Sequence, residues 1–179
     1  MIPLRSNVSA GFTLIEVMVV IAIAAVLLSI AVPSFFATTQ RFRTLGEINS
    51  FAHDLQFART EAIKQGVPVS MCASSDGVRC LKINTWHKGW IVFTDAAAAL
   101  KVDALLRVQP GWTNTDTLLA DNAVFAFTFS RDGYTIGLPG TGTVTATLQT
   151  TPLNSAATQC LALIKTGRQQ VLPAGPGCG

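Results

Sequence analysis

The sequence predicts an α+β fold in which one long N-terminal helix packs on an antiparallel, β-rich C-terminal domain. Hydrophobic residues fill 25 of the first 36 positions, including an unbroken run over Val17–Leu28. Beyond Gly66 the helical pattern gives way to short segments rich in Val, Ile, Phe and Thr, which favour strands. Only 13% of the 179 residues are charged, against roughly 25% in ordinary soluble domains. This composition excludes a disordered tail, a charged coiled coil and a strongly basic nucleic-acid coat.

Residues 12–36 form a predicted single transmembrane helix. Only five residues interrupt the apolar segment, namely Thr13, Glu16, Ser29, Pro33 and Ser34. At a rise of ~1.5 Å per residue, the helix is long enough to cross a bilayer core of about 30 Å. A signal peptide would end in a small-x-small cleavage site, whereas this run passes directly into a helical pattern, which favours an anchor. The positive charge that precedes it, Arg5, favours a cytoplasmic N-terminus, with most of the chain across the membrane.

Residues 37–66 are expected to continue the helix in amphipathic form. Apolar residues recur there every three or four positions and form one stripe, made of Leu45, Ile48, Ala52, Leu55, Ala58 and Ala62. Gly66 followed by Pro68 is a stop signal for the helix. Phe51 and Phe57 lie off the stripe but are also expected in the core. We expect the stripe to pack on the remaining domain, residues 67–179.

The strands of this domain are predicted from runs of β-branched and aromatic residues. The candidates are Val67–Ala73, Arg79–Asn84, Trp90–Thr94, Leu105–Gln109, Val124–Ser130, Thr143–Gln149 and Cys160–Thr166. Asp76-Gly77 and Asp132-Gly133 are tight-turn signals, and the second predicts a hairpin. The segment Ala96–Leu100 is expected to form a loop or short turn. The predicted architecture is one antiparallel sheet under one long helix, with Trp86, Trp90 and Phe93 in the core.

Four cysteines lie in the part of the chain that is expected to be exported, so disulfides are predicted. Three pairings are possible, and the local one joins Cys72 to Cys80 and Cys160 to Cys178. Each such bond would stabilise the fold by roughly 2–3 kcal/mol. The cysteine spacings are not those of a zinc site, and the two histidines lie in unrelated segments, so no metal is expected.

No catalytic constellation can be assembled from the sequence. The glycine-rich stretch Gly137–Thr143 lacks the Gly-Lys-Ser/Thr that ends a phosphate loop, and a turn is the better interpretation. His53 and His87 offer no nucleophile, base and orienting group within one motif. We therefore expect a non-enzymatic protein without a cofactor.

The string Gly11-Phe12-Thr13-Leu14-Ile15-Glu16 stands directly before the apolar run. Together they resemble the N-terminus of type IV pilins and type II secretion pseudopilins. The resemblance implies that residues 1–11 are a leader, which a prepilin peptidase removes after Gly11 before methylating the amino group of Phe12. It also implies that Glu16 pairs with a mature N-terminal amine, which is consistent with the cost of an unpaired charge in an apolar core. Pro33 matches the proline that kinks or loosens the helix in these proteins.

The rest of the chain resembles the GspH/FimT branch of minor pilins and minor pseudopilins. The matching stretches are residues 72–80, 86–95, 129–133 and 160–168. This resemblance implies a type IV pilin-like fold and a place in the tip or initiation complex of a pilus or pseudopilus. The implied partners are other pilins and the inner-membrane assembly platform, with the anchor in the bacterial inner membrane and the domain in the periplasm. From there the subunit would enter a filament at or beyond the cell surface.

Three alternatives stay open on the sequence. The chain is a minor pilin or minor pseudopilin (of a type IV pilus, or the H-type subunit of type II secretion), a pilus-tip DNA-binding module with the same anchor, or an anchored protein that never assembles. FimT-type members bind DNA in natural transformation through a Gly-Arg-x-Arg element, and here Gly167-Arg168 is followed by Gln170 in place of the second arginine. Lys165 and Arg168 are therefore the candidate DNA contacts, with Arg131, Arg79, Lys82 or Lys88 as additional charges.

Overall fold

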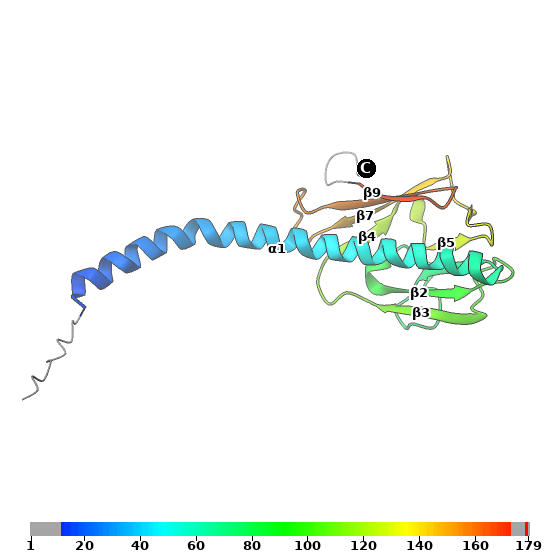
Figure 1. The fold of residues 1–179 in the computed structure, drawn as a ribbon, viewed down its shortest axis with the longest axis horizontal. Coiled ribbons are helices and arrows are strands. Elements are labelled where there is room, and N and C mark those ends of the chain that lie inside the picture. The colour runs from blue at the N-terminus through cyan, green and yellow to red at the C-terminus, as the bar shows by residue number, and fades with distance from the viewer. Residues whose placement is uncertain (1–11, 173–177, 179) are drawn as a thin grey trace, which may run out of the picture. The chain divides into compact units, whose positions relative to one another are not determined.

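The computed structural model describes residues 12–172 and Cys178 (Figure 1). The long helix α1 spans Leu14–Gln65. The strands that follow are β1 Val69–Ala73, β2 Gly89–Thr94, β3 Ala104–Pro110, β4 Thr117–Ala120, β5 Ala126–Phe129, β6 Thr135–Ile136, β7 Thr143–Gln149, β8 Gln159–Ile164 and β9 Gln169–Leu172. Two 3₁₀ turns, η1 Trp86–Lys88 and η2 Asp121–Ala123, lie among them. The chain divides into two compact units between Thr39 and Gln40.

The second unit contains two antiparallel sheets, so the prediction of a single sheet is wrong. Sheet A has the order β3-β2-β1-β5-β6, and sheet B has the order β4-β7-β8-β9. The chain crosses from sheet A to sheet B after β3, returns for β5 and β6, and crosses again to β7. Residues of α1 from Ile48 to Ala62 share one core cluster with the inner faces of both sheets. One flat sheet covers only one side of a helix, whereas two sheets enclose a wider apolar stripe.

Phe51 lies at the centre of this core. Its ring contacts Trp86 and Trp90 edge-on, at centroid distances of 5.1 and 5.3 Å, and Phe127 at 6.3 Å. Such edge-to-face pairs add to the free energy that burial alone supplies. The expectation that Phe51 is a core residue is confirmed, and so is the burial of both tryptophans.

The two sheets differ in how they are covered. Every residue of β1 and β2 is buried, because loops cover the face of sheet A that α1 does not. Between these loops and sheet A lies a second, smaller apolar cluster, which contains Cys72, Ile91 and Phe93. Phe93 is therefore buried as predicted, but in a different cluster from Trp86 and Trp90. In β7, by contrast, buried and more exposed residues alternate, which indicates one face on the core and one in solvent.

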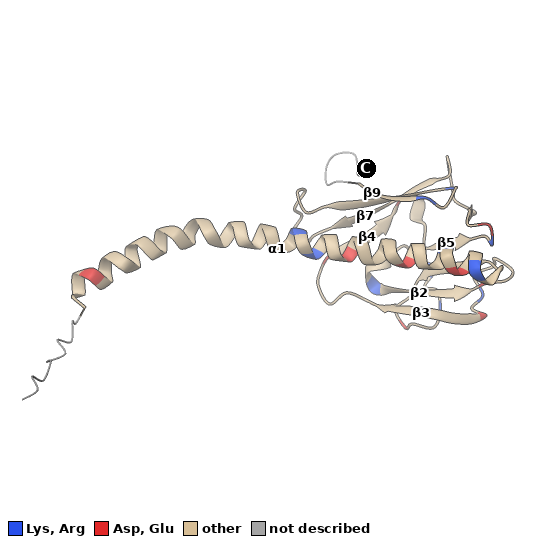
Figure 2. Ribbon diagram, viewed as in Figure 1, with Lys and Arg blue, Asp and Glu red and all other residues tan. Residues whose placement is uncertain are grey.

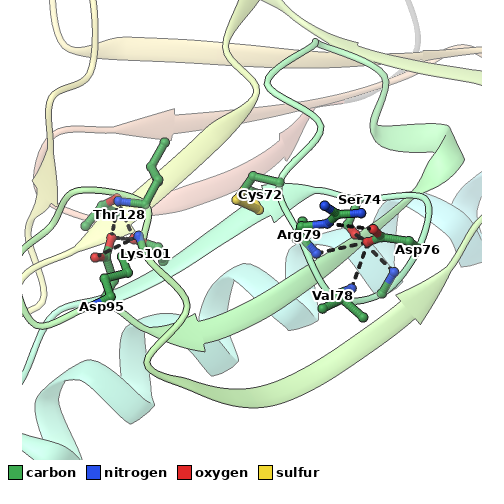
Figure 3. The surroundings of a disulfide bond; sticks show 12 residues. Cys72, Ser74, Asp76, Val78, Arg79, Asp95, Lys101 and Thr128 are labelled. Carbon is green, nitrogen blue, oxygen red and sulfur yellow. Dashed lines mark hydrogen bonds and ion pairs between the residues drawn. A yellow bond between two sulfur atoms is a disulfide. The ribbon is translucent and has the colours of Figure 1, made fainter.

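The predicted strand Arg79–Asn84 is not a strand. Asp76 accepts the backbone amides of Val78 and Arg79, both at 2.9 Å (Figure 3). These two amide bonds hold the pKa of Asp76 well below its ordinary value. The disulfide Cys72–Cys80 and the left-handed backbone of Lys82, with φ of 55°, complete a folded loop. Local side-chain bonds therefore replace a strand ladder in this segment.

The other strand predictions are confirmed within a few residues, and three strands were missed. The missed strands are β4, β6 and β9, all at sheet edges and at most four residues long. The hairpin predicted at Asp132-Gly133 is present between β5 and β6. Ala96–Leu100 is a turn, as expected.

Candidate functional site

The first candidate site is the start of α1. Phe12 is 82% exposed and precedes the helix, while Gly11 lies outside the described residues. The backbone amide of Glu16 donates to the Thr13 hydroxyl at 3.3 Å, so Thr13 caps the helix. This capping role was not predicted, although Thr13 and Glu16 have the Thr-x-x-Glu spacing of a capping box.

Glu16 is the single charged residue between Phe12 and Gln40, as Figure 2 shows. Every residue from Phe12 to Thr39 is exposed in the isolated chain. Within the described part of this unit no basic side chain is present to pair with the carboxylate. A carboxylate placed in an apolar environment without a partner is costly. Pairing of Glu16 with a mature N-terminal amine therefore stays a prediction.

The helix around Pro33 is uninterrupted. Pro33 lies inside α1 and lacks the amide that would donate to the preceding turn. Helical structure continues on both sides of it, so the structure contains no break of the kind a helix terminus would make. A loosening role for Pro33 stays a prediction. Among the described residues, α1 alone is long and apolar enough to cross a membrane.

Both disulfides have the local pairing. Cys72 bonds to Cys80 and Cys160 to Cys178, with Cα–Cα distances of 5.5 and 5.6 Å. The first holds the loop after β1 over the outer face of sheet A. The second joins β8 to a residue beyond β9, and the Thr147 hydroxyl also contacts the Cys178 carbonyl at 3.4 Å.

The second candidate site is the turn between β8 and β9, where Lys165 and Arg168 are both exposed. Gly167 has φ of 76°, and its amide donates to the Ile164 carbonyl at 2.8 Å. A Cβ on Gly167 would lie 2.1 Å from the Gly133 carbonyl oxygen, so only glycine fits where the two turns meet.

Arg59 of α1 holds these two turns together. Its Nε donates to the Gly133 carbonyl at 2.9 Å and a terminal nitrogen donates to the Thr166 carbonyl at 3.3 Å. Arg59 was not predicted as a functional residue, because one arginine on an amphipathic helix cannot be told from any other solvated charge in the sequence. Its consequence is that the β5–β6 hairpin and the β8–β9 turn act as one structural unit.

This unit brings some of the predicted DNA contacts together. Arg131 lies two residues before Gly133, so it joins Lys165 and Arg168 in adjoining turns, with Asp132 beside it. The two predicted contacts line different depressions. Lys165 lines one with Gly142 and Thr135, whereas Arg168 lines another with Gln170. The remaining candidates, Arg79, Lys82 and Lys88, belong to the segment between β1 and β2 and are not part of these turns.

An apolar helix with a single carboxylate near its start, continued into an antiparallel two-sheet domain, defines the class of pilin-type subunits. The family described as type II transport protein GspH matches residues 47–167, and the prokaryotic N-terminal methylation motif matches residues 6–32. The chain therefore belongs to the GspH family, and it is a minor pilin or pseudopilin of the GspH/FimT type.

Solved structures support this assignment at the level of the fold. The type IV minor pilin FimU of Pseudomonas aeruginosa strain PAO1, in space group P21, is similar with a TM-score of 0.58 and 24% identity, covering 78% of this chain and 93% of FimU. A second crystal form of FimU, in space group P65, gives a TM-score of 0.55 and 25% identity over 74% of this chain and 92% of FimU. No curated protein sequence matches the chain. The pilin-like fold is thus confirmed, and the family points to assembly with other pilins or pseudopilins.

Proposed function

We propose that this subunit is processed by prepilin peptidase after Gly11 and assembles, through Glu16, into the tip or initiation complex of a type IV pilus. The observation that carries the proposal is the exposed apolar half of α1 with one carboxylate in its first turn. A membrane buries the apolar side chains but gives the carboxylate no partner. A neighbouring subunit offers both an apolar surface and a mature N-terminal amine.

The placement of the domain follows from its chemistry. The two disulfides support a periplasmic domain, because disulfides persist in oxidising compartments. The apolar half of α1 supports an anchor in the inner membrane before assembly. The likeness to FimU favours the type IV pilus, and the H-type minor pseudopilin of type II secretion is the alternative. The role is that of a non-enzymatic building block served by an inner-membrane assembly platform.

Mass spectrometry of the mature protein and a Glu16→Ala variant test this proposal. We expect a chain that begins at N-methylated Phe12. We also expect that Glu16→Ala is exported but lost at least tenfold from the sheared filament fraction. The matched control is Asp121→Ala, an exposed acid of the second unit, which should incorporate normally. Intact residues 1–11 in mature protein would favour an anchored protein that never assembles. Normal incorporation of the Glu16→Ala variant into the filament would contradict the proposed pairing of Glu16 with an N-terminal amine.

A second experiment distinguishes a type IV pilus from a type II secretion system. The gene is deleted, and twitching motility and protein secretion of the deletion strain are measured. Loss of twitching with normal secretion is expected. Loss of secretion alone would assign the chain to type II secretion.

DNA binding is a second candidate function, favoured by the adjoining exposed cations Arg131, Lys165 and Arg168. Few phosphate contacts give weak, salt-sensitive binding, so a gel shift is best run at ~50 mM salt. We expect Arg168→Ala to weaken the shift and Gln170→Arg, which restores the second arginine, to strengthen it. The control Arg79→Ala, whose side chain is 84% exposed outside these turns, should leave the shift unchanged. Absence of a shift, or equal shifts for all variants, would end this proposal.

A further inference from the structure

A cavity of about 360 Å³ opens beside β5, on the face of sheet A that α1 does not cover. Ala126 and Thr128 of β5 line it together with Leu100, Ile136 and Leu138. None of the residues that line it is charged. It lies between two connections that cross from one sheet to the other, residues 121–125 and 137–142.

The backbone of Ala126 is unpaired at this cavity. The Phe125 carbonyl accepts the Ala73 amide at 3.0 Å, so Phe125 faces β1. Alternation along an antiparallel strand turns the Ala126 amide and carbonyl to the other side. There Thr128 pairs with Ile136, and the next partner of Ala126 in this register would be Leu138. The chain leaves the ladder at Gly137, with φ of 73°, and no backbone or side chain among the described residues bonds Ala126.

Two residues that line the cavity, Leu100 and Thr128, are held by bonds that lead to buried Asp95, at the left of Figure 3. Its carboxylate accepts the Leu100 amide and the Ser70 hydroxyl, each at 2.8 Å. Ser70 in turn contacts the Thr128 hydroxyl at 2.7 Å. The cavity is therefore preformed, and a ligand would not have to order this wall before binding.

Strained backbone surrounds the same cavity. Four of the five non-glycine residues with positive φ among the described residues line it, namely Ala98, Leu100, Asn122 and Ala123. Left-handed backbone is unfavourable at such residues and is often found at binding sites.

The other open edge of sheet A is protected. β3 pairs with β2 through a bulge at Val92 and Phe93, carries Arg107, and ends at Pro110. Bulges, charges and proline are features that discourage strand addition. The edge of β5 has a short partner and an apolar cavity instead.

We propose that this cavity binds an extended, uncharged polypeptide strand of a neighbouring subunit, which continues sheet A along β5. The strand would donate to the Ala126 carbonyl and accept its amide, in the mode of β-augmentation. Every second side chain of a strand points to the same face, so a small or aliphatic one would enter the space between Leu100, Ile136 and Leu138. That the donor is a subunit of the same assembly rests on the proposed function, whereas the preference for a strand does not.

The test uses the ¹⁵N-labelled full chain in detergent micelles, titrated with an end-blocked six-residue peptide of alternating Val and Thr. We expect saturable shifts of the Ala126, Gly137 and Leu138 amides, and at least tenfold slower hydrogen exchange at Ala126. Ile136→Lys, at a rim residue 42% exposed, should weaken binding at least tenfold. The matched control Leu105→Lys, 46% exposed on β3, should not.

Shifts that do not saturate at millimolar peptide, or that map to β3, would overturn the proposal. Equal losses for the two lysine variants would overturn it as well. Peptide binding needs no assembly, so its failure is distinct from failure of the pilin function. Normal filament incorporation of Ile136→Lys, alongside lost peptide binding, would exclude a neighbouring subunit as donor.

Discussion

The two halves of α1 belong to one helix and meet opposite surroundings. From Leu14 to Thr39 every side chain is exposed, and Glu16 is the single charge. From Gln40 to Gln65 one face is buried, with Ile48, Phe51 and Leu55 fully enclosed. The first half is apolar all round, and none of its side chains is buried by the described residues, as expected of a helix that works in lipid or between other helices.

Charges show the same contrast. In the second half, four charged side chains are bonded to the domain, namely Arg43, Glu47, Asp54 and Arg59. Arg43 donates two hydrogen bonds to buried Asp116, at 2.8 and 2.9 Å. The Asp54 carboxylate accepts hydrogen bonds from the Trp90 indole at 2.8 Å and from the Arg107 guanidinium at 2.5 Å. These bonds fix which face of the helix meets the sheets, whereas Glu16 has no such bond in the first half. The comparison indicates that the second half stabilises the domain, and under the proposed function the first half serves assembly.

The largest expected effect comes from a matched pair of phenylalanines on α1. Phe51→Ala should lower the free energy of unfolding of the domain by about 3–5 kcal/mol, because it leaves a cavity among three aromatic rings. Phe42→Ala, at a side chain 70% exposed, should change it by less than about 0.5 kcal/mol. Urea unfolding followed by tryptophan fluorescence measures both. Equal losses would mean that the exposed face of this half also packs within the domain.

Removing a disulfide should have the next largest effect and should be confined to the second unit. The Cys160→Ser, Cys178→Ser double variant is expected to lose about 3 kcal/mol, from the greater freedom of the unfolded chain. The comparable Cys72→Ser, Cys80→Ser variant closes a shorter loop and should lose slightly less. Circular dichroism of α1 in micelles should stay unchanged at 25 °C. A fall in helix content would show that the apolar half depends on the domain.

The smallest effect is expected at Glu47. Burial raises the pKa of this carboxyl, against the opposing effect of the bond from Asn114, and one of its oxygens is buried without a partner. A raised folded-state pKa means that stability is lost as the pH rises above the ordinary value of 4.5.

Glu47→Gln should therefore flatten this decline as the pH rises above 4.5, by less than about 1 kcal/mol because the group is only partly buried. Thermal unfolding at several pH values measures it. The control is Glu61→Gln, whose pKa is lowered by bonds to Gln65 and Lys64 and which should not flatten the decline. If the stability of Glu47→Gln falls with pH as steeply as that of the unmodified protein, Glu47 is not the cause of the decline.

The long helix and the presence of disulfides could be predicted because their signals are local, whereas the choice among the three possible pairings came from the structure. Hydrophobic period, a Gly-Pro stop and cysteine spacing all act within a few residues. The division into two sheets could not be predicted, because it depends on which distant strands meet around α1. The short edge strands β4 and β9 were missed for a different reason, because four residues are too few to show an alternating pattern.

The candidate sites show the same limit. Glu16 could be found in the sequence because an acid within an apolar run is conspicuous. The roles of Arg59 and Ala126 could not be found, because each depends on backbone groups from other parts of the chain. Thr13 could have been found, since its spacing to Glu16 is that of a capping box.

The bond between Cys160 and Cys178 has a mechanical consequence. β9 is the outermost strand of sheet B, and an edge strand pulled from one end separates one hydrogen bond at a time. Because the disulfide joins β8 to Cys178, tension applied beyond Cys178 passes into β8 and bypasses β9. β8 is paired on both sides, so such a load would have to shear two ladders together. If the subunit enters a filament as proposed, this edge strand is thereby removed from the path of the force.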